Sequence, residues 1–161
     1  MFTGGITIRP VKEDDCQNLL IWRNHPDVRH WCFEDREISL TEHKEWFKKA
    51  IKDKDTYMYI AEDEKNMPLG QVRFKVTGVC AEININLNPD FFGKGLGHII
   101  IRKVTEFFLA QRPDMGEIFA DIIEDNVASL KAFQKVGYAV WSTGLRKSGK
   151  NFIRLVYYAH P

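Results

Sequence analysis

The sequence contains 161 residues, a length typical of one domain, and its 44% hydrophobic and 12% aromatic content supplies enough apolar side chains for a packed core. That composition argues against a disordered chain. Lysine and arginine number 23 against 22 aspartate and glutamate residues, so the net charge of +1 gives no electrostatic support for a nucleic-acid-binding or membrane-surface protein. An even balance still leaves room for a local basic pocket.

The cysteines and histidines point away from disulfides and metals. Cys16, Cys32 and Cys80 are an odd number without a CxxC pair, so we expect reduced thiols in a cytoplasmic protein. The five histidines form no HExxH motif, and we predict no metal site. The start of the chain lacks the features of a signal peptide, and no apolar run reaches the roughly 18 residues of a membrane span.

In chain order, the hydrophobic pattern predicts seven strands and about four helices. The predicted strands cover residues 7–9, 56–61, 70–76, 81–87, 118–123, a segment beginning at Tyr138, and 152–158. The predicted helices cover residues 14–22, a segment that Ser39 and Glu42 open with capping-box spacing and that runs to Ile51, 97–111, and 126–136. Helix–strand alternation is confined to the second half, so we expect an α/β fold with a mixed, mostly antiparallel sheet and helices on both faces.

A glycine-rich turn links the fourth predicted strand to the long helix. It reads Phe92-Gly93-Lys94-Gly95-Leu96-Gly97-His98. Alternate glycines let backbone amides approach a ligand, and the helix N-terminus adds unpaired N–H groups and partial positive charge, which suits a pyrophosphate. The turn matches neither a P-loop nor a dinucleotide fingerprint. A purely steric glycine turn is the alternative.

A second motif follows about 30 residues later, at 126–138. With the glycine turn, it resembles the GNAT superfamily of acyl-CoA N-acyltransferases, and the resemblance extends over nearly the whole chain as one domain, 1–161. Gly95 and Gly97 match the family's pyrophosphate loop. The later family segment is matched by Asn126, Ser129, Phe133, Lys135, Gly137 and Tyr138.

This resemblance implies acetyl-CoA as the cosubstrate. The expected cofactor-binding residues are Ile85, Asn86, Leu87, Phe92, Gly93, Lys94, Gly95, Leu96, Gly97, His98, Asn126, Ser129, Phe133 and Lys135. In the family, the strand before the loop parts from its neighbour and pairs with the pantetheine arm, a role that falls here to 85–87. Phe92 stands where the family loop usually has glutamine or arginine, and a plain helix cap is the alternative role for Asn126.

Acetyl transfer to an amine requires loss of a proton from the ammonium group. Strand alternation places Glu82 on the open face of the sheet, and Asp121 lies where some family members carry a catalytic carboxylate. Either is a candidate base; the alternative is an ordinary ion pair with Arg23, Arg73 or Lys75.

The acid that would protonate the departing thiolate is less clearly marked. Phe133 replaces the tyrosine that many family members have at this position, and phenylalanine cannot donate a proton. Ser129, Tyr138 and solvent remain as candidates.

The segment 22–33 is dense in aromatic and cationic side chains and is predicted to form much of the acceptor pocket. The candidate substrate-binding residues are Arg23, Asn24, Arg29, Trp31 and Phe33. The alternative is structural, with arginines in ion pairs and aromatic rings anchoring helices. For Trp22 and Trp46 we expect the structural role.

The run 20–26, followed by Ile38, Glu42-His43 and Trp46, is similar to the acetyltransferases of pseudaminic acid biosynthesis. Those enzymes acetylate the 4-amino group of a UDP-linked 4-amino-4,6-dideoxy sugar, so a nucleotide-linked amino sugar is the expected acceptor. The same region is related to ribosomal-protein N-terminal acetyltransferases, and a non-catalytic acyl-CoA-binding module is a third reading. We also expect an exposed final strand that can pair across a homodimer.

Overall fold

The computed structural model describes residues 4–160. Its strands are β1 (Thr7–Pro10), β2 (Thr56–Glu62), β3 (Pro68–Thr77), β4 (Cys80–Leu87), β5 (Glu117–Ile123), β6 (Ala139–Leu145) and β7 (Asn151–Tyr158). Its α-helices are α1 (Cys16–Asn24), α2 (Pro26–Arg29), α3 (Leu40–Ala50), α4 (Gly97–Gln111) and α5 (Val127–Val136). Two 3-10 turns, Glu13–Asp15 and Pro89–Phe91, precede α1 and follow β4.

The seven strands form one sheet in the order β1-β2-β3-β4-β5-β7-β6. Every neighbouring pair is antiparallel except β4 and β5, which are parallel and connected through α4. The predicted mixed, mostly antiparallel sheet is confirmed. The expectation that the final strand is an exposed edge is wrong, because β7 lies between β5 and β6, and β6 forms the edge of the described sheet.

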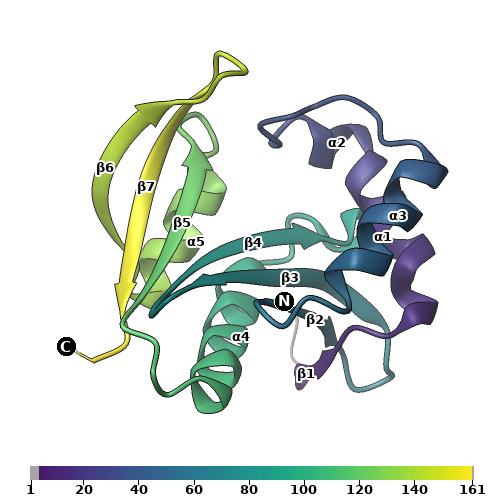
Figure 1. The fold of residues 1–161 in the computed structure, drawn as a ribbon, viewed down its shortest axis with the longest axis horizontal. Coiled ribbons are helices and arrows are strands. Elements are labelled where there is room, and N and C mark those ends of the chain that lie inside the picture. The colour runs from purple at the N-terminus through teal and green to yellow at the C-terminus, as the bar shows by residue number, and fades with distance from the viewer. Residues whose placement is uncertain (1–3, 161) are drawn as a thin grey trace.

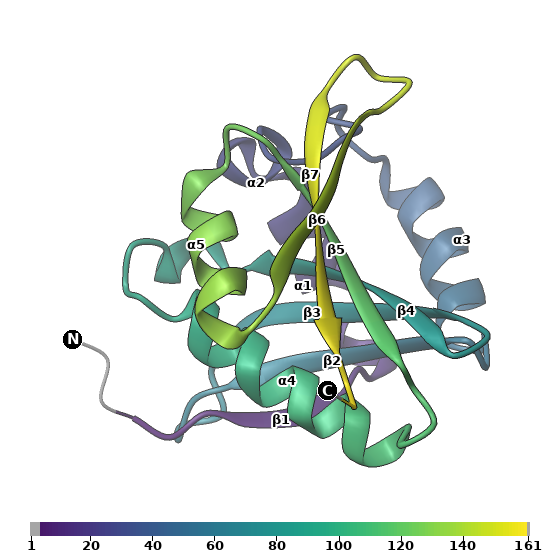
Figure 2. The same cartoon turned by 90° about the vertical axis from the view of Figure 1, so that its left-hand side faces the viewer.

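Helices cover both faces of the sheet, as predicted, with α4 and α5 on one side and α1 and α3 on the other (Figure 2). Alternation along β2 sends Tyr59 and Ala61 into the larger core beneath α4, and Met58 and Ile60 into a smaller core beneath α1 and α3. The larger core also holds a stacked aromatic pair, Phe74 and Phe108, with ring centroids 4.1 Å apart. The two cores fix the helices that carry the site.

Local signals set most of the element ends. Helix α4 has the predicted bounds, and Ser39 caps α3 by accepting a hydrogen bond from the Glu42 amide at 3.2 Å. The capping box is incomplete, because the Glu42 carboxylate pairs with Arg36 instead. Tyr138 precedes β6 rather than opening it.

No helix within residues 4–160 combines the length and the apolar character needed to cross a bilayer. The three cysteines are free thiols. In the same part of the chain, no cluster of three or more histidine, cysteine, aspartate or glutamate residues is arranged to hold a metal ion.

Candidate active site

The sheet opens between β4 and β5, at its parallel seam. The seam pairs Cys80 with Glu117, Ala81 with Ile118 and Glu82 with Phe119. Beyond it, β4 remains with β3 and β5 remains with β7, so the two strands point in clearly different directions (Figure 1). Within the described sheet, the edge of β4 over Ile85, Asn86 and Leu87 therefore lacks a β5 partner. An extended ligand can pair with such an edge as an added strand.

The glycine turn lies between β4 and α4. Gly93 and Gly95 have φ angles of +73° and +71°, which glycine adopts without strain. A Cβ added to either would meet nothing within 4 Å, so these positions need glycine for backbone conformation and not for space. Phe92 and Lys94 in the same turn are exposed. The turn thus presents its backbone to solvent.

The first turn of α4 presents unused hydrogen-bond donors. Its first intrahelical bond runs from the Ile100 amide to the Leu96 carbonyl at 3.0 Å, so the amides of Gly97, His98 and Ile99 have no partner within the helix. Leu96 is buried and anchors the turn against the core. Free amides and the helix dipole together suit an anion.

Basic side chains surround the same end of α4. Burial, and then repulsion from Lys135 and Arg102, lowers the pKa of His98. Arg102 also donates a hydrogen bond to the Lys135 carbonyl at 3.1 Å, which holds α4 and α5 together here. Arg102 and Lys135 therefore give this region positive charge.

Helix α5 packs against the start of α4 with its C-terminal half, where Ala132 faces Gly97 and Lys135 lies near His98. At the other end of α5, the Asn126 side chain accepts a hydrogen bond from the Ser129 amide at 3.2 Å, so the helix-cap role expected as an alternative is present. Ser129 is half-buried in the first turn.

Two residues expected at the site lie in the core instead. Tyr138 is 2% exposed and its hydroxyl hydrogen-bonds Thr105 at 3.0 Å, while burial raises its pKa. Phe133 is 1% exposed and packs edge-to-face on Tyr138. The expectation of Tyr138 as an acid is corrected accordingly, because its hydroxyl is enclosed away from the open sheet. Phe133 supports α5 by packing.

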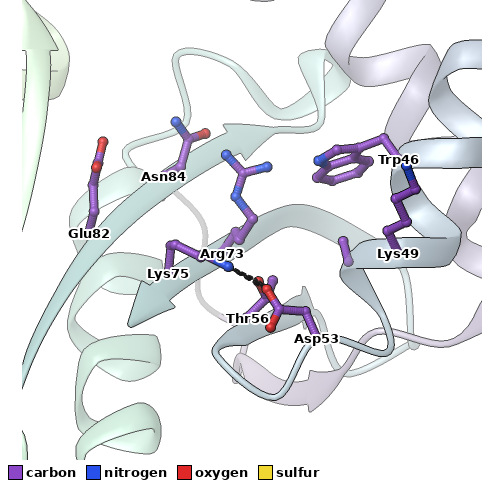
Figure 3. A pocket seen from close by; sticks show the side chains of 9 residues that line it. Trp46, Lys49, Asp53, Thr56, Arg73, Lys75, Glu82 and Asn84 are labelled. Atoms are coloured by element: carbon purple, nitrogen blue, oxygen red, sulfur yellow. Dashed lines mark hydrogen bonds and ion pairs between the residues drawn. The ribbon is translucent and has the colours of Figure 1, made fainter. Parts of the chain in front are cut away.

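The opposite face of the sheet contains a cavity of about 500 Å³ (Figure 3). It is lined by Trp46, Lys49, Ala50, Asp53, Thr56, Arg73, Lys75, Glu82 and Asn84. Helix α3 contributes one wall, and β3 and β4 contribute the floor. Lys75 and Asp53, which both line the cavity, form an ion pair with each other.

Glu82 lies on this face, as strand alternation predicts. Its side chain is 53% exposed, and the nearest charged partner is Arg146, with an Nη2–Oε1 distance of 3.8 Å. Glu82 sits at the last residue pair of the seam, so its carboxylate stands where β4 and β5 begin to separate. It combines access to the cavity with closeness to the opening.

Asp121 also lies near the opening but is enclosed. Its side chain is 1% exposed and accepts hydrogen bonds from Arg154 at 2.6 and 2.7 Å and from Arg146 at 2.5 Å. The partners expected for an ion pair, Arg23, Arg73 or Lys75, are not the ones used. Both carboxylate oxygens are occupied, which favours a structural carboxylate.

The cationic residues of the segment 22–29 hold a loop. Arg23 donates to the carbonyls of Glu34 and Arg36, and Arg29 donates to that of Asp35. Asn24 makes two hydrogen bonds of 2.8 Å to the backbone of Ile38. None of these three side chains lines the cavity. These side chains anchor the loop in this structure, and a substrate-binding role for them stays a prediction.

The loop that they hold reaches the β6–β7 hairpin. Phe33 meets Phe152 edge-to-face at 6.0 Å, and the Arg146 guanidinium lies 4.5 Å from the Phe33 ring. Lys150 donates to the Cys32 carbonyl at 2.6 Å. Trp31 is partly exposed and packs on His30. Phe33 thus joins the N-terminal helices to the far side of the opened sheet.

Two cavity residues were missed by the sequence analysis. Trp46, for which we expect a structural role, is 37% exposed and forms part of a cavity wall. Trp22, by contrast, is buried, as expected. Arg73 was considered only as an ion-pair partner. The alternation of β3 around Phe74 would have placed Arg73 on the same face as Glu82.

The comparisons with known proteins agree with this geometry. The family model described as "Acetyltransferase (GNAT) domain" matches residues 6–139. YwnH of Bacillus subtilis strain 168, provisionally named a phosphinothricin acetyltransferase, is 25% identical over 145 residues, which cover 84% of this chain and 85% of that protein. Protein MJ1062 of Methanocaldococcus jannaschii is 24% identical over 136 residues, 83% of this chain but only 28% of that relative's length.

Solved structures share the fold. Spermidine N-acetyltransferase from Vibrio cholerae, in complex with CoA and spermine, superposes with a TM-score of 0.86 at 17% identity, covering 96% of this chain and 95% of that one. Aminoglycoside acetyltransferase AAC(6')-Ib with ribostamycin and coenzyme A gives a TM-score of 0.82 at 21% identity, covering 96% and 93%. On the extent of the family match, the chain belongs to the GNAT family and is an acetyl-CoA-dependent N-acetyltransferase.

Proposed function

We propose that this enzyme transfers the acetyl group of acetyl-CoA to the primary amine of a nucleotide-linked amino sugar. The 4-amino group of a UDP-linked 4-amino-4,6-dideoxy sugar is the specific acceptor that we favour, on the resemblance of residues 20–26 to the pseudaminic acid branch. The observation that carries the transferase mechanism is the opening between β4 and β5, which has unpaired amides of α4 on one side and the Glu82 cavity on the other.

On the donor side, the amides of residues 93–98 would hold the diphosphate of CoA. The free edge of β4 over 85–87 would pair with the pantetheine arm. Lys135 and Lys94 would add positive charge. Backbone amides of this kind do not depend on the side chain at position 92. Phe92 in place of the usual glutamine or arginine is therefore compatible with CoA binding.

On the acceptor side, we assign Glu82 as the base. The acceptor ammonium gives a proton to Glu82, directly or through water, and the neutral nitrogen then bonds to the acetyl carbon. The carbon–sulfur bond breaks, and the nitrogen, cationic after the attack, loses its second proton. The thiolate that leaves takes up one proton, either from that nitrogen through water or from the Ser129 hydroxyl, which solvent then reprotonates; a thiol with a pKa of about 8.5 is mostly protonated at neutral pH. Asp121 would act as a positioning residue that holds Arg146 and Arg154.

The cavity supports an acceptor that carries negative charge. Its cationic side chains outnumber its carboxylates, three to two, and the pair Lys75–Asp53 neutralises one of each. Spermine and ribostamycin, which are bound in two of the structural relatives, are polycations. A site with surplus positive charge disfavours them and favours a sugar joined to a diphosphate.

The donor site is tested by Gly95→Ala. Alanine at a left-handed φ costs about 1–2 kcal/mol, so the turn should leave its native shape and CoA should bind roughly tenfold more weakly in calorimetry. Gly78→Ala is the matched control, because Gly78 has a φ of +63°, open space around it and a place in the distant β3–β4 turn. Equal CoA affinities in the two variants would contradict the assignment.

His98 should report on the diphosphate directly. In the free protein its pKa lies below 6.5, and a diphosphate nearby would favour the protonated ring and raise that pKa. At a pH between the pKa of His98 in the free protein and its pKa in the CoA complex, CoA binding is accompanied by protonation of the imidazole. The affinity for CoA therefore increases as the pH falls through this range. NMR titration of the imidazole with and without CoA measures the shift, with the other histidines as internal references. An unmoved pKa would place the diphosphate elsewhere.

The base is tested by comparing the two carboxylates. Glu82→Gln should lower kcat about 10²- to 10⁴-fold while the melting temperature and CoA affinity stay unchanged, since Glu82 is exposed and outside the donor site. Asp121→Asn should instead lower the free energy of unfolding by about 1–3 kcal/mol, because Arg146 and Arg154 lose their buried partner. Unchanged turnover in Glu82→Gln would remove Glu82 as the base.

The acceptor is tested by release of free CoA from acetyl-CoA with three amines. We expect the highest kcat/KM with the UDP-linked 4-amino sugar and lower values with a ribosomal-protein N-terminal peptide and with spermidine. A preference for the peptide would support the ribosomal-protein alternative and contradict the nucleotide-sugar acceptor. Binding of acetyl-CoA with no turnover of any amine would contradict the assignment of an amine acceptor to this cavity.

A further inference from the structure

Arg73 is the guanidinium at the centre of the acceptor cavity. Its neighbours in β3, Val72 and Phe74, are buried in the core beneath α4, so alternation turns Arg73 to the opposite face. There it projects between Asn84 of β4 and Trp46 of α3 (Figure 3). The guanidinium lies 5.3 Å from the centre of the Trp46 ring.

Arg73 forms no ion pair in the described residues 4–160. No carboxylate lies within 4 Å of it there, and its guanidinium donates no hydrogen bond. The nearby carboxylates have other partners: Asp53 pairs with Lys75 and accepts a hydrogen bond from Thr56, and Glu82, which attracts Arg73 only from a longer distance, lies 3.8 Å from Arg146. Arg73 is half-buried, and burial lowers its pKa, so an anion brought to the guanidinium would stabilise its charge.

The contact with Trp46 orients the guanidinium without neutralising it. An aromatic ring attracts a cation and contacts one face of the planar group, while the N–H groups around its rim stay available. Such a fork matches the oxygens of a phosphate or a carboxylate, to which arginine donates two parallel hydrogen bonds. Lys49, on the same wall of the cavity, adds a second positive charge.

We propose that Arg73 determines acceptor specificity by binding an anionic group of the acceptor, and that it excludes polycationic amines by repulsion. This inference rests on the proposed use of the cavity for the acceptor, but not on the acceptor being a nucleotide sugar. A phosphate or diphosphate is the group that we favour, since Arg73 and Lys49 together offer two positive charges to a dianion.

The test compares Arg73→Gln with Lys48→Gln. Both changes remove one positive charge, but Lys48 is an exposed side chain of α3 that does not line the cavity. Acetyl-CoA-dependent CoA release is measured with a UDP-linked amino sugar, an amino sugar phosphate, the unphosphorylated amino sugar, an amino acid and spermidine. CoA affinity and melting temperature are measured for each variant to establish that it is folded and binds the donor.

In Arg73→Gln, KM for the phosphorylated acceptors should rise about 10- to 100-fold with kcat nearly unchanged, while KM for the unphosphorylated sugar stays within about threefold. KM for spermidine should fall as the repulsion is removed. Lys48→Gln should leave the preference for phosphorylated over neutral sugar intact. If KM rises more for the amino acid than for the phosphorylated acceptors, the group bound by Arg73 is a carboxylate and not a phosphate.

Binding of inorganic pyrophosphate to the CoA-loaded enzyme provides a second measurement that does not depend on turnover. We expect pyrophosphate to bind the wild type and Lys48→Gln and to bind Arg73→Gln at least tenfold more weakly. Equal binding to all three proteins, or an unchanged phosphorylated-to-neutral KM ratio in Arg73→Gln, would overturn the role of Arg73. Failure of all three proteins to bind CoA would instead overturn the proposed function.

Discussion

The fold depends on the short parallel seam between β4 and β5. The sheet consists of two antiparallel parts, β1 to β4 and β5-β7-β6, and each has its own nearly complete ladder of hydrogen bonds. Opening the sheet at the seam therefore sacrifices few backbone pairs. Opening it anywhere else would interrupt an antiparallel ladder. The parallel boundary is therefore the place where a strand edge can be exposed with the smallest loss of backbone hydrogen bonds.

Packing on both faces keeps the parts together where the backbone does not. On one face, α4 buries Ile100, Val104 and Phe108 in the core that includes residues of β3, β4 and β5. On the other, Phe33 meets Phe152, and Arg146 links Asp121 to the aromatic rings above it. The opening is thus bounded by rigid contacts, and a preformed gap of this kind binds an extended ligand without a large loss of conformational entropy.

Features carried by local sequence were predictable, and features carried by distant partners were not. The helix 97–111 follows from its glycine start and apolar spacing, and the exposed position of Glu82 follows from alternation alone. The partners of Asp121 lie 25 and 33 residues away on another hairpin, so spacing gives no access to them. Arg23 and Arg29 resembled ligand-binding residues because composition cannot distinguish a free guanidinium from one bonded to carbonyls of the next loop.

Arg73 was named only as an ion-pair partner, although the sequence does indicate its place in the cavity. A tight turn at Gly78 makes β3 and β4 a hairpin, in which Arg73 pairs with Asn84 and Lys75 with Glu82. Once register and alternation are combined, all four side chains fall on one face. What register cannot show is that Asp53, from outside the hairpin, neutralises Lys75 and leaves Arg73 without a partner.

A net charge of +1 conceals two separate regions of positive charge. One surrounds the start of α4, and the other lies in the cavity on the opposite face, with Glu82 near the boundary. An ammonium group brought to Glu82 would stand close to Arg146, whose charge opposes its own and lowers the pKa of the ammonium. That repulsion assists transfer of the proton to Glu82. The cation that selects the acceptor, Arg73, and the cation that helps to deprotonate its amine, Arg146, are thus separate groups.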